Sequence, residues 1–146
     1  MGFTVPSLTA NSREPLAPGE WEMEVSKFVS GVSSQKKTPF VQVIFKVTDE
    51  EAVDTSGEEY KRPFYGDKFY LTEKAMFRIH NFASAAGVDL DEVGQDFDDL
   101  KAYAVALTDA FKGAEAVVTT DLRDYEDKDG NTKYVAEAVD DGVEFS

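Results

Sequence analysis

Two stretches of apolar side chains, separated by a short polar segment, constrain the fold of this chain most strongly. Trp21, Met23 and Val25 alternate with polar residues, which predicts a strand with one buried face. Residues 40–47 are nearly all apolar and rich in β-branched and aromatic side chains, so they predict a strand buried on both faces. Because only the nine residues 31–39 join the two, we expect a long antiparallel hairpin with a basic loop.

The rest of the chain predicts three further strands and two helices. We expect a strand at 64–71, a helix capped by Thr72 at 72–86, a short helix at about 98–112, and strands at 114–125 and 132–139. Residues 49–59 and 88–95 are interpreted as acidic loops, the first of them exposed and mobile. The Asp-Gly pair at 129–130 predicts a tight hairpin, and a two-residue turn there would place Tyr125 opposite Tyr134 on one face.

This order of elements indicates the fold class. It predicts a mainly β protein with a five-stranded OB-fold-like barrel, a helix between strands 3 and 4, and a short extra helix. An open α+β sheet with the same order is the alternative. The predicted organisation is an irregular proline-containing arm at 1–18, an OB-like nucleic-acid-binding domain at 19–139, and a disordered acidic tail at 140–146.

Composition argues against several classes of site. A chain of 146 residues suits one domain, and without cysteine it forms no disulfide, thiolate metal site or cysteine nucleophile. Its single histidine argues against a catalytic triad or a multi-histidine site. With Gly130 as the sixth position of a calcium loop, Tyr125 and Ala136 would stand first and twelfth, where carboxylates are needed. We therefore expect no enzyme, no catalytic residue, no metal and no cofactor.

Charge is distributed unevenly along the chain, whose formal net charge is −14. Residues 25–48 carry four lysines and no acid, and residues 60–82 carry five basic and two acidic side chains. Both segments are rich in aromatic residues. Cations that follow phosphates and rings that stack on unpaired bases are what a single-stranded nucleic acid requires.

The side chains predicted to bind nucleic acid come from these two segments and from the last hairpin. They are Lys27, Phe28, Lys36, Lys37, Lys46, Lys61, Arg62, Tyr65, Tyr125 and Tyr134. The alternative for the lysines is a solubilising surface role, and the alternative for the rings is a place in the core or a structural cross-strand pair.

The last seven residues predict a partner contact. Asp140, Asp141 and Glu144 could meet a basic rim while Phe145 enters a pocket of another protein. The same acidic segment could occupy the protein's own basic groove when DNA is absent, so its deletion is expected to tighten DNA binding.

The segments PGEWEMEV, FVQVIFKV, FYLTEKAMFRIHNFASAAGVD and FKGAEAVVTTDLRDYEDKDGNTKYV resemble small phage-encoded single-stranded DNA-binding proteins, over roughly residues 18–139. The ending DDGVEFS is similar to the acidic tip with a terminal phenylalanine found on such proteins. The resemblance implies an OB-type fold, sequence-independent binding of single-stranded DNA in phage DNA replication, recombination or repair, and tail contacts to phage replication or recombination proteins.

Several alternatives stay open. An acidic DNA mimic would bind a basic DNA-processing enzyme, and a phage structural or interaction protein would assemble without DNA; a metal-dependent nuclease is the weakest rival. A homodimer is also open. No apolar run reaches the length of a membrane helix and no secretory signal is evident, which predicts no membrane contact and a cytoplasmic location, in the host cell if the protein is viral.

Overall fold

The chain folds around one antiparallel sheet, as a computed structural model that describes residues 14–146 shows. The strands are β1 (Gly19–Val32), β2 (Pro39–Val47), β3 (Phe64–Tyr70), β4 (Glu115–Glu126) and β5 (Thr132–Phe145). The helices are α2 (Met76–Ala85), α3 (Leu90–Val93) and α4 (Leu100–Phe111). The mainly β class, the five strands and the helices between the third and fourth strands are therefore as predicted. Among the described helices none is long and apolar enough to cross a membrane.

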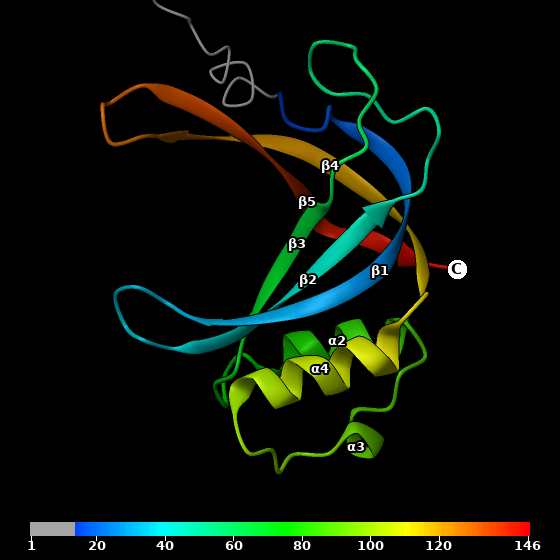
Figure 1. Cartoon of the computed structure of the whole chain (residues 1–146), viewed down its shortest axis with the longest axis vertical. Coiled ribbons are helices and arrows are strands. Elements are labelled where there is room, and N and C mark those ends of the chain that lie inside the picture. The colour runs from blue at the N-terminus through cyan, green and yellow to red at the C-terminus, as the bar shows by residue number, and fades with distance from the viewer. Residues whose placement is uncertain (1–13) are drawn as a thin grey trace, which may run out of the picture.

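The sheet is open rather than closed. Its strand order is β3-β2-β1-β4-β5, so β3 and β5 are its two edges. Figure 1 shows a strongly curved sheet whose β1–β2 and β4–β5 hairpins project to the same side, with the three helices gathered beneath it. The predicted closed barrel is not confirmed, and the open α+β sheet predicted as the alternative fits this arrangement.

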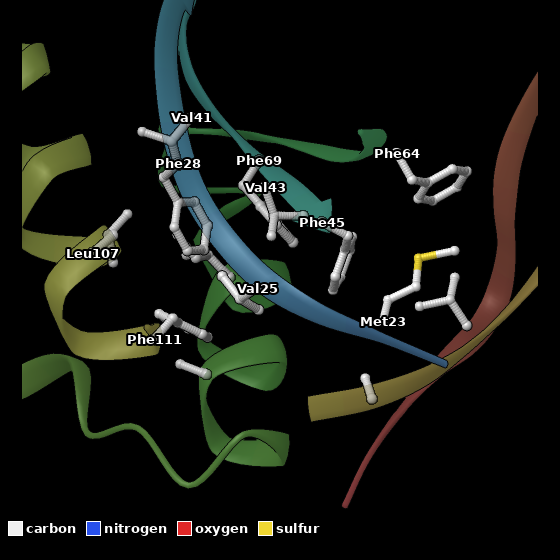
Figure 2. Close-up of a cluster of buried hydrophobic side chains, with 14 of the residues drawn as sticks. Met23, Val25, Phe28, Val41, Val43, Phe45, Phe64, Phe69, Leu107 and Phe111 are labelled. Carbon is white, nitrogen blue, oxygen red and sulfur yellow. The ribbon is translucent and has the colours of Figure 1, made fainter. Parts of the chain in front are cut away.

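The hydrophobic core lies on one face of the sheet. Val41, Val43 and Phe45 of β2 are almost completely buried, because alternate residues of a strand point to the same side. A bulge between Val25 and Lys27 shifts the register of β1 so that Phe28 also faces the core. Figure 2 shows Phe28 pointing from β1 toward Leu107 and Phe111 of α4. The Phe28 and Phe111 ring centroids are 4.9 Å apart.

The first helix is shorter than predicted. The hydroxyl of Thr72 accepts a hydrogen bond from the backbone N–H of Ala75 at 3.2 Å, as a capping residue would, but α2 begins only at Met76. The turn around Thr72 therefore precedes the helix instead of starting it. The predicted loop 88–95 contains the one-turn helix α3, which begins where the side chain of Asp89 accepts from the N–H of Asp91.

Two segments predicted to be irregular contribute to the core. Leu16 is completely buried and pairs with Asp54, so the boundary predicted at residue 18 is wrong; the rest of the predicted arm, 1–13, lies outside the described residues. Ala52 is buried as well, and the side chain of Asp54 accepts hydrogen bonds from the backbone N–H groups of Ser56 and Glu58. The acidic connection 49–59 is therefore largely exposed, as predicted, but Ala52 anchors it in the hydrophobic core.

The predicted disordered tail is wrong, because β5 continues to Phe145. Phe145 pairs with Ala116 of β4, and its ring centroid lies 5.1 Å from that of Phe82 on α2. A bulge after Ala138 interrupts β5, where Asp141 has a positive φ of 57° and an added Cβ on Gly142 would lie 2.8 Å from the carbonyl oxygen of Val139. This irregularity hides the strand pattern in the sequence.

Candidate nucleic-acid interface

The outer face of β1, β2 and β3 carries basic and aromatic side chains in cross-strand rows. Partners in register share a face, so Lys27, Ile44 and Tyr65 form one row across the three strands. The β2–β3 pairs Gln42 with Lys68 and Phe40 with Tyr70 form the neighbouring rows. We name this face the β3 surface, and it consists of Lys27, Phe40, Gln42, Ile44, Lys46, Tyr65, Lys68 and Tyr70.

The prediction that residues 40–47 are buried on both faces is therefore wrong for part of the outer face. Ile44 is only 3% exposed, but Phe40 and Gln42 are half-buried and Lys46 is exposed. Lys46 stands opposite Glu24, which marks the acidic boundary of the β3 surface.

A bulge in β3 places Tyr65 and Lys68 on the same face, although in a regular strand residues three apart face opposite sides. Gly66 lies at this bulge, where an added Cβ would come within 2.6 Å of a methyl carbon of Val43. The side-chain amide of Gln42 donates to the carbonyl oxygen of Gly66 at 3.0 Å and holds the two strands together there. Only glycine allows this close approach, so Gly66 fixes which side chains form the surface.

The side chains of the β3 surface support one another. The Lys68 ammonium lies 4.8 Å from the centre of the Phe40 ring, and the Phe40 and Tyr70 rings meet edge to face at 5.8 Å. Tyr65 stands opposite Ile44 on the neighbouring strand and keeps 62% of its surface exposed. The surface thus presents a cation and a free ring beside each other.

A groove of about 770 Å³ lies between the two edge strands and continues the β3 surface. Tyr65 and Lys68 line it from β3, and Tyr134 lines it from β5, with 57% of that tyrosine exposed. Arg62 and Arg123 also line it. We name it the β3–β5 groove.

Two ion pairs lie along the groove. The Arg78 guanidinium is 3.8 Å from the Asp67 carboxylate, and the Arg123 guanidinium is 2.9 Å from that of Glu137. Partial burial raises the pKa of Asp67 above its ordinary value; Arg78 opposes the rise, and the negative charges of Asp140 and Glu137 add to it. The Asp67 side chain remains 46% exposed, so its burial is only partial.

Arg62 contacts a ring and a carbonyl group in the groove. Its guanidinium lies 4.7 Å from the centre of the Tyr60 ring and donates to the backbone carbonyl of Glu14. Burial raises the pKa of the Tyr60 hydroxyl, which donates to the carbonyl of Pro63. The contacts with Tyr60 and Glu14 hold Arg62 at the lining of the groove.

Of the predicted binding residues, the structure places six along β3 and the strands and loops beside it. Lys27, Lys46 and Tyr65 belong to the β3 surface, and Arg62 and Tyr134 line the adjoining groove. Lys36, in the β1–β2 loop, shares a smaller pocket with Tyr70 at the other end of β3. Arg62 and Lys36 thus lie near opposite ends of β3. The basic and aromatic side chains between them form one continuous band along this strand.

The other predicted residues lie elsewhere. Phe28 is a core residue, so its predicted stacking role is wrong. Lys37 lies exposed at the tip of the β1–β2 loop, with a φ of 52°. Lys61 is exposed and forms an ion pair with Glu59 at 3.2 Å, outside the groove.

The prediction that Tyr125 and Tyr134 share a face is also wrong. Tyr125 pairs with Lys133, and Tyr134 pairs with Asp124, so the two tyrosines point to opposite faces of the β4–β5 hairpin. The cause is the loop: the carboxylate of Asp127 accepts from the N–H groups of Asp129 and Asn131, which closes a longer turn than the predicted one. The backbone hydrogen bond from Asn131 is the main reason that the pKa of Asp127 is lowered.

The sequence prediction missed several residues of the interface. They are Phe40, Gln42, Ile44, Lys68, Tyr70, Arg78 and Arg123. Phe40 and Gln42 could have been predicted, since they alternate with Val41 and Val43. They also belong to the same series of every second residue as Lys46, which was predicted. Lys68 could not, because the bulge at Gly66 reverses the alternation of β3.

No protein-family model matches this chain, and no curated protein matches it either. In residues 14–146 no three histidine or carboxylate side chains gather in an arrangement that could hold a metal ion. The function is therefore argued from the geometry of the β3 surface and the adjoining groove.

Proposed function

We propose that this protein binds single-stranded DNA without sequence preference, as the resemblance to phage single-strand binders implies, and that its sheet is an OB-fold opened between β3 and β5. OB-folds bind oligonucleotides across the face of their second and third strands and the flanking loops. The β2–β3 face of this sheet is the one that carries Tyr65, Lys68 and Phe40. The β1–β2 loop beside it contributes Lys36.

The mechanism combines charge neutralisation with stacking. Lys27, Lys46, Lys68 and Arg62 contact phosphates, and the release of condensed counterions makes binding favourable at low salt. Tyr65 stacks on an unpaired base, and its ring offers an exposed face for that purpose. Because the rest of the chain is strongly acidic, its other surfaces repel the phosphate backbone, and the strand binds along this band.

The single observation that carries the proposal is the row-by-row placement of Lys27, Tyr65 and Lys68 on one exposed face. Lys27 on β1 is far in sequence from Tyr65 and Lys68 on β3, and β2 lies between the two strands. A solubilising role for the lysines would not require rings between them.

A charge-reversal experiment tests the proposal. We expect the double variant Lys27→Glu/Lys68→Glu to bind a fluorescent thymidine 20-mer at least tenfold more weakly than the unchanged protein, by fluorescence anisotropy. The control is Lys101→Glu/Lys112→Glu, which changes the net charge equally at two exposed positions of the α4 region and is expected to retain nearly full affinity. Equal losses in both variants would mean that only overall charge matters and would reject the β3 surface as the site.

The same measurement separates the rival functions. A DNA mimic or a structural protein would show no binding of the 20-mer by the unchanged protein at low salt. Tight binding to a basic DNA-processing enzyme in place of DNA would then favour the mimic.

A further inference from the structure

The β3–β5 groove exists because the sheet does not close. β3 and β5 are edge strands, so each presents a row of backbone N–H and C=O groups along its outer edge. The groove is lined from β3 by the segment around Gly66 and from β5 by the segment around Ala136. A ligand that enters it therefore meets backbone donors and acceptors from two strands, which a closed barrel would have paired with each other.

Two tyrosines line this groove from its two sides. Tyr65 belongs to β3 and Tyr134 to β5, and each exposes more than half of its surface. Exposed rings on both sides of a groove suit a flat ligand with polar edges, because the faces can stack while the edges reach backbone groups. An unpaired nucleobase has this shape and this distribution of polar atoms.

The groove is also lined by cationic side chains, which phosphates on either side of such a base require. Arg62 and Lys68 line the groove and contact aromatic rings, while Arg78 and Arg123 are paired with carboxylates. The groove volume of about 770 Å³ lies within the range of about 300–1,000 Å³ that small-molecule sites occupy. A duplex, whose bases are paired and stacked, has no free base to place there.

We infer that the β3–β5 groove takes one unpaired nucleobase of a bound strand, stacked by Tyr65 and Tyr134 and hydrogen-bonded along its edge by backbone groups of the two edge strands. The inference rests on the proposed function and adds that the β3–β5 groove is itself part of the binding site. The bound DNA strand passes from the outer face of β3 into the β3–β5 groove, and the β4–β5 hairpin contacts it from the other side.

Tyrosine variants and a base-free ligand test this inference. The probes are a thymidine 20-mer and an abasic deoxyribose-phosphate 20-mer, which keeps the phosphates and lacks the bases. We expect Tyr65→Ala and Tyr134→Ala each to weaken thymidine 20-mer binding about tenfold and to leave abasic binding unchanged, because stacking on one base is lost. The phenylalanine variants at both positions should retain the binding, since they keep the ring.

The matched control is Tyr125→Ala, which removes a tyrosine that is 45% exposed on the opposite face of the same hairpin. It should bind both probes as the unchanged protein does, and thermal unfolding should show that all variants are folded. If the unchanged protein binds the thymidine 20-mer and Tyr134→Ala behaves like Tyr125→Ala, the groove does not hold a base, although the proposed function stands. If the unchanged protein does not bind the 20-mer, the proposed function fails and this inference fails with it.

Discussion

Phe28 and Tyr65 show how the surroundings of a ring decide its role. Both rings come from the basic, aromatic segments of the chain, but Phe28 is buried against Phe111 and Tyr65 is exposed above Ile44. The backbone N–H of Phe28 donates to the hydroxyl of Thr108, which anchors β1 to α4 as well. Phe28 therefore stabilises the domain, whereas the ring of Tyr65 is available at the surface.

Alanine substitution separates these two roles. We expect Phe28→Ala to lower the free energy of unfolding by about 3–5 kcal/mol, the usual loss for a buried aromatic side chain. Tyr65→Ala should lower it by less than about 1 kcal/mol, because exposed positions contribute little. Urea unfolding followed by circular dichroism measures both values, and equal losses would contradict the assignment of Phe28 to the core.

The carboxylate of Asp67 gives a prediction about pH. Partial burial raises the pKa of this carboxyl group, which means that the folded state disfavours its ionised form. At neutral pH the ionised Asp67 therefore destabilises the folded protein. We expect Asp67→Asn to raise the melting temperature at pH 7, although it removes the attraction of Arg78. The gain should shrink as the pH falls through the raised pKa of Asp67, and it should vanish below the ordinary value of 3.8, where the group is protonated in both states.

Melting temperatures measured between pH 3 and pH 8 on both proteins test this expectation. A lower melting temperature of Asp67→Asn at pH 7, with a difference that vanishes toward pH 3, would show that the ion pair with Arg78 outweighs the burial of Asp67.

At the scale of whole elements, β5 differs most from its expected form. Its last residues pair with β4, and Phe145 packs on α2. Asp140 and Asp141 lie at the bulge, and Glu144 is exposed. The acidic residues that were predicted to form a free tail therefore lie on strand β5. A contact of Phe145 with a partner would require this strand to detach first.

Deletion of residues 140–146 should therefore destabilise the fold. We expect a loss of at least about 3 kcal/mol in the free energy of unfolding, since the deletion removes strand pairing and a half-buried aromatic ring. The control is Asp140→Asn/Asp141→Asn/Glu144→Gln, which removes the charges but keeps the strand and should unfold near the original denaturant concentration. If the deletion leaves stability unchanged, the last residues do not act as a strand.

The elements show what the sequence could and could not predict. Periodicity and turn residues correctly predicted five strands and two of the helices, because these patterns are local. The bulges near Lys27, Gly66 and Asp141 were not predictable, since each depends on which strand lies alongside. Each bulge also decides which side chains share a face, and for that reason part of the predicted site was wrong at Phe28 and incomplete at Lys68.

At the scale of the whole molecule, a basic and aromatic band lies on an acidic body. The band runs from Lys36 along the β3 surface to Arg62 and the β3–β5 groove. The acidic residues lie largely in the C-terminal half of the sequence and in the 49–59 connection. Such a separation predicts binding that salt weakens strongly and that favours flexible single strands, whose bases can reach the rings.

Whether the basic and aromatic band binds single strands is measured by the salt dependence of the affinity. If about four phosphates are neutralised, the slope of log affinity against log salt concentration should be near −3, at about 0.7 per phosphate of a single strand. Fluorescence anisotropy with a thymidine 20-mer and with a duplex of equal length, each over a series of salt concentrations, measures it. We expect this slope together with much weaker duplex binding. A flat salt dependence, or equal affinity for the two ligands, would mean that the band is not a site for single-stranded DNA.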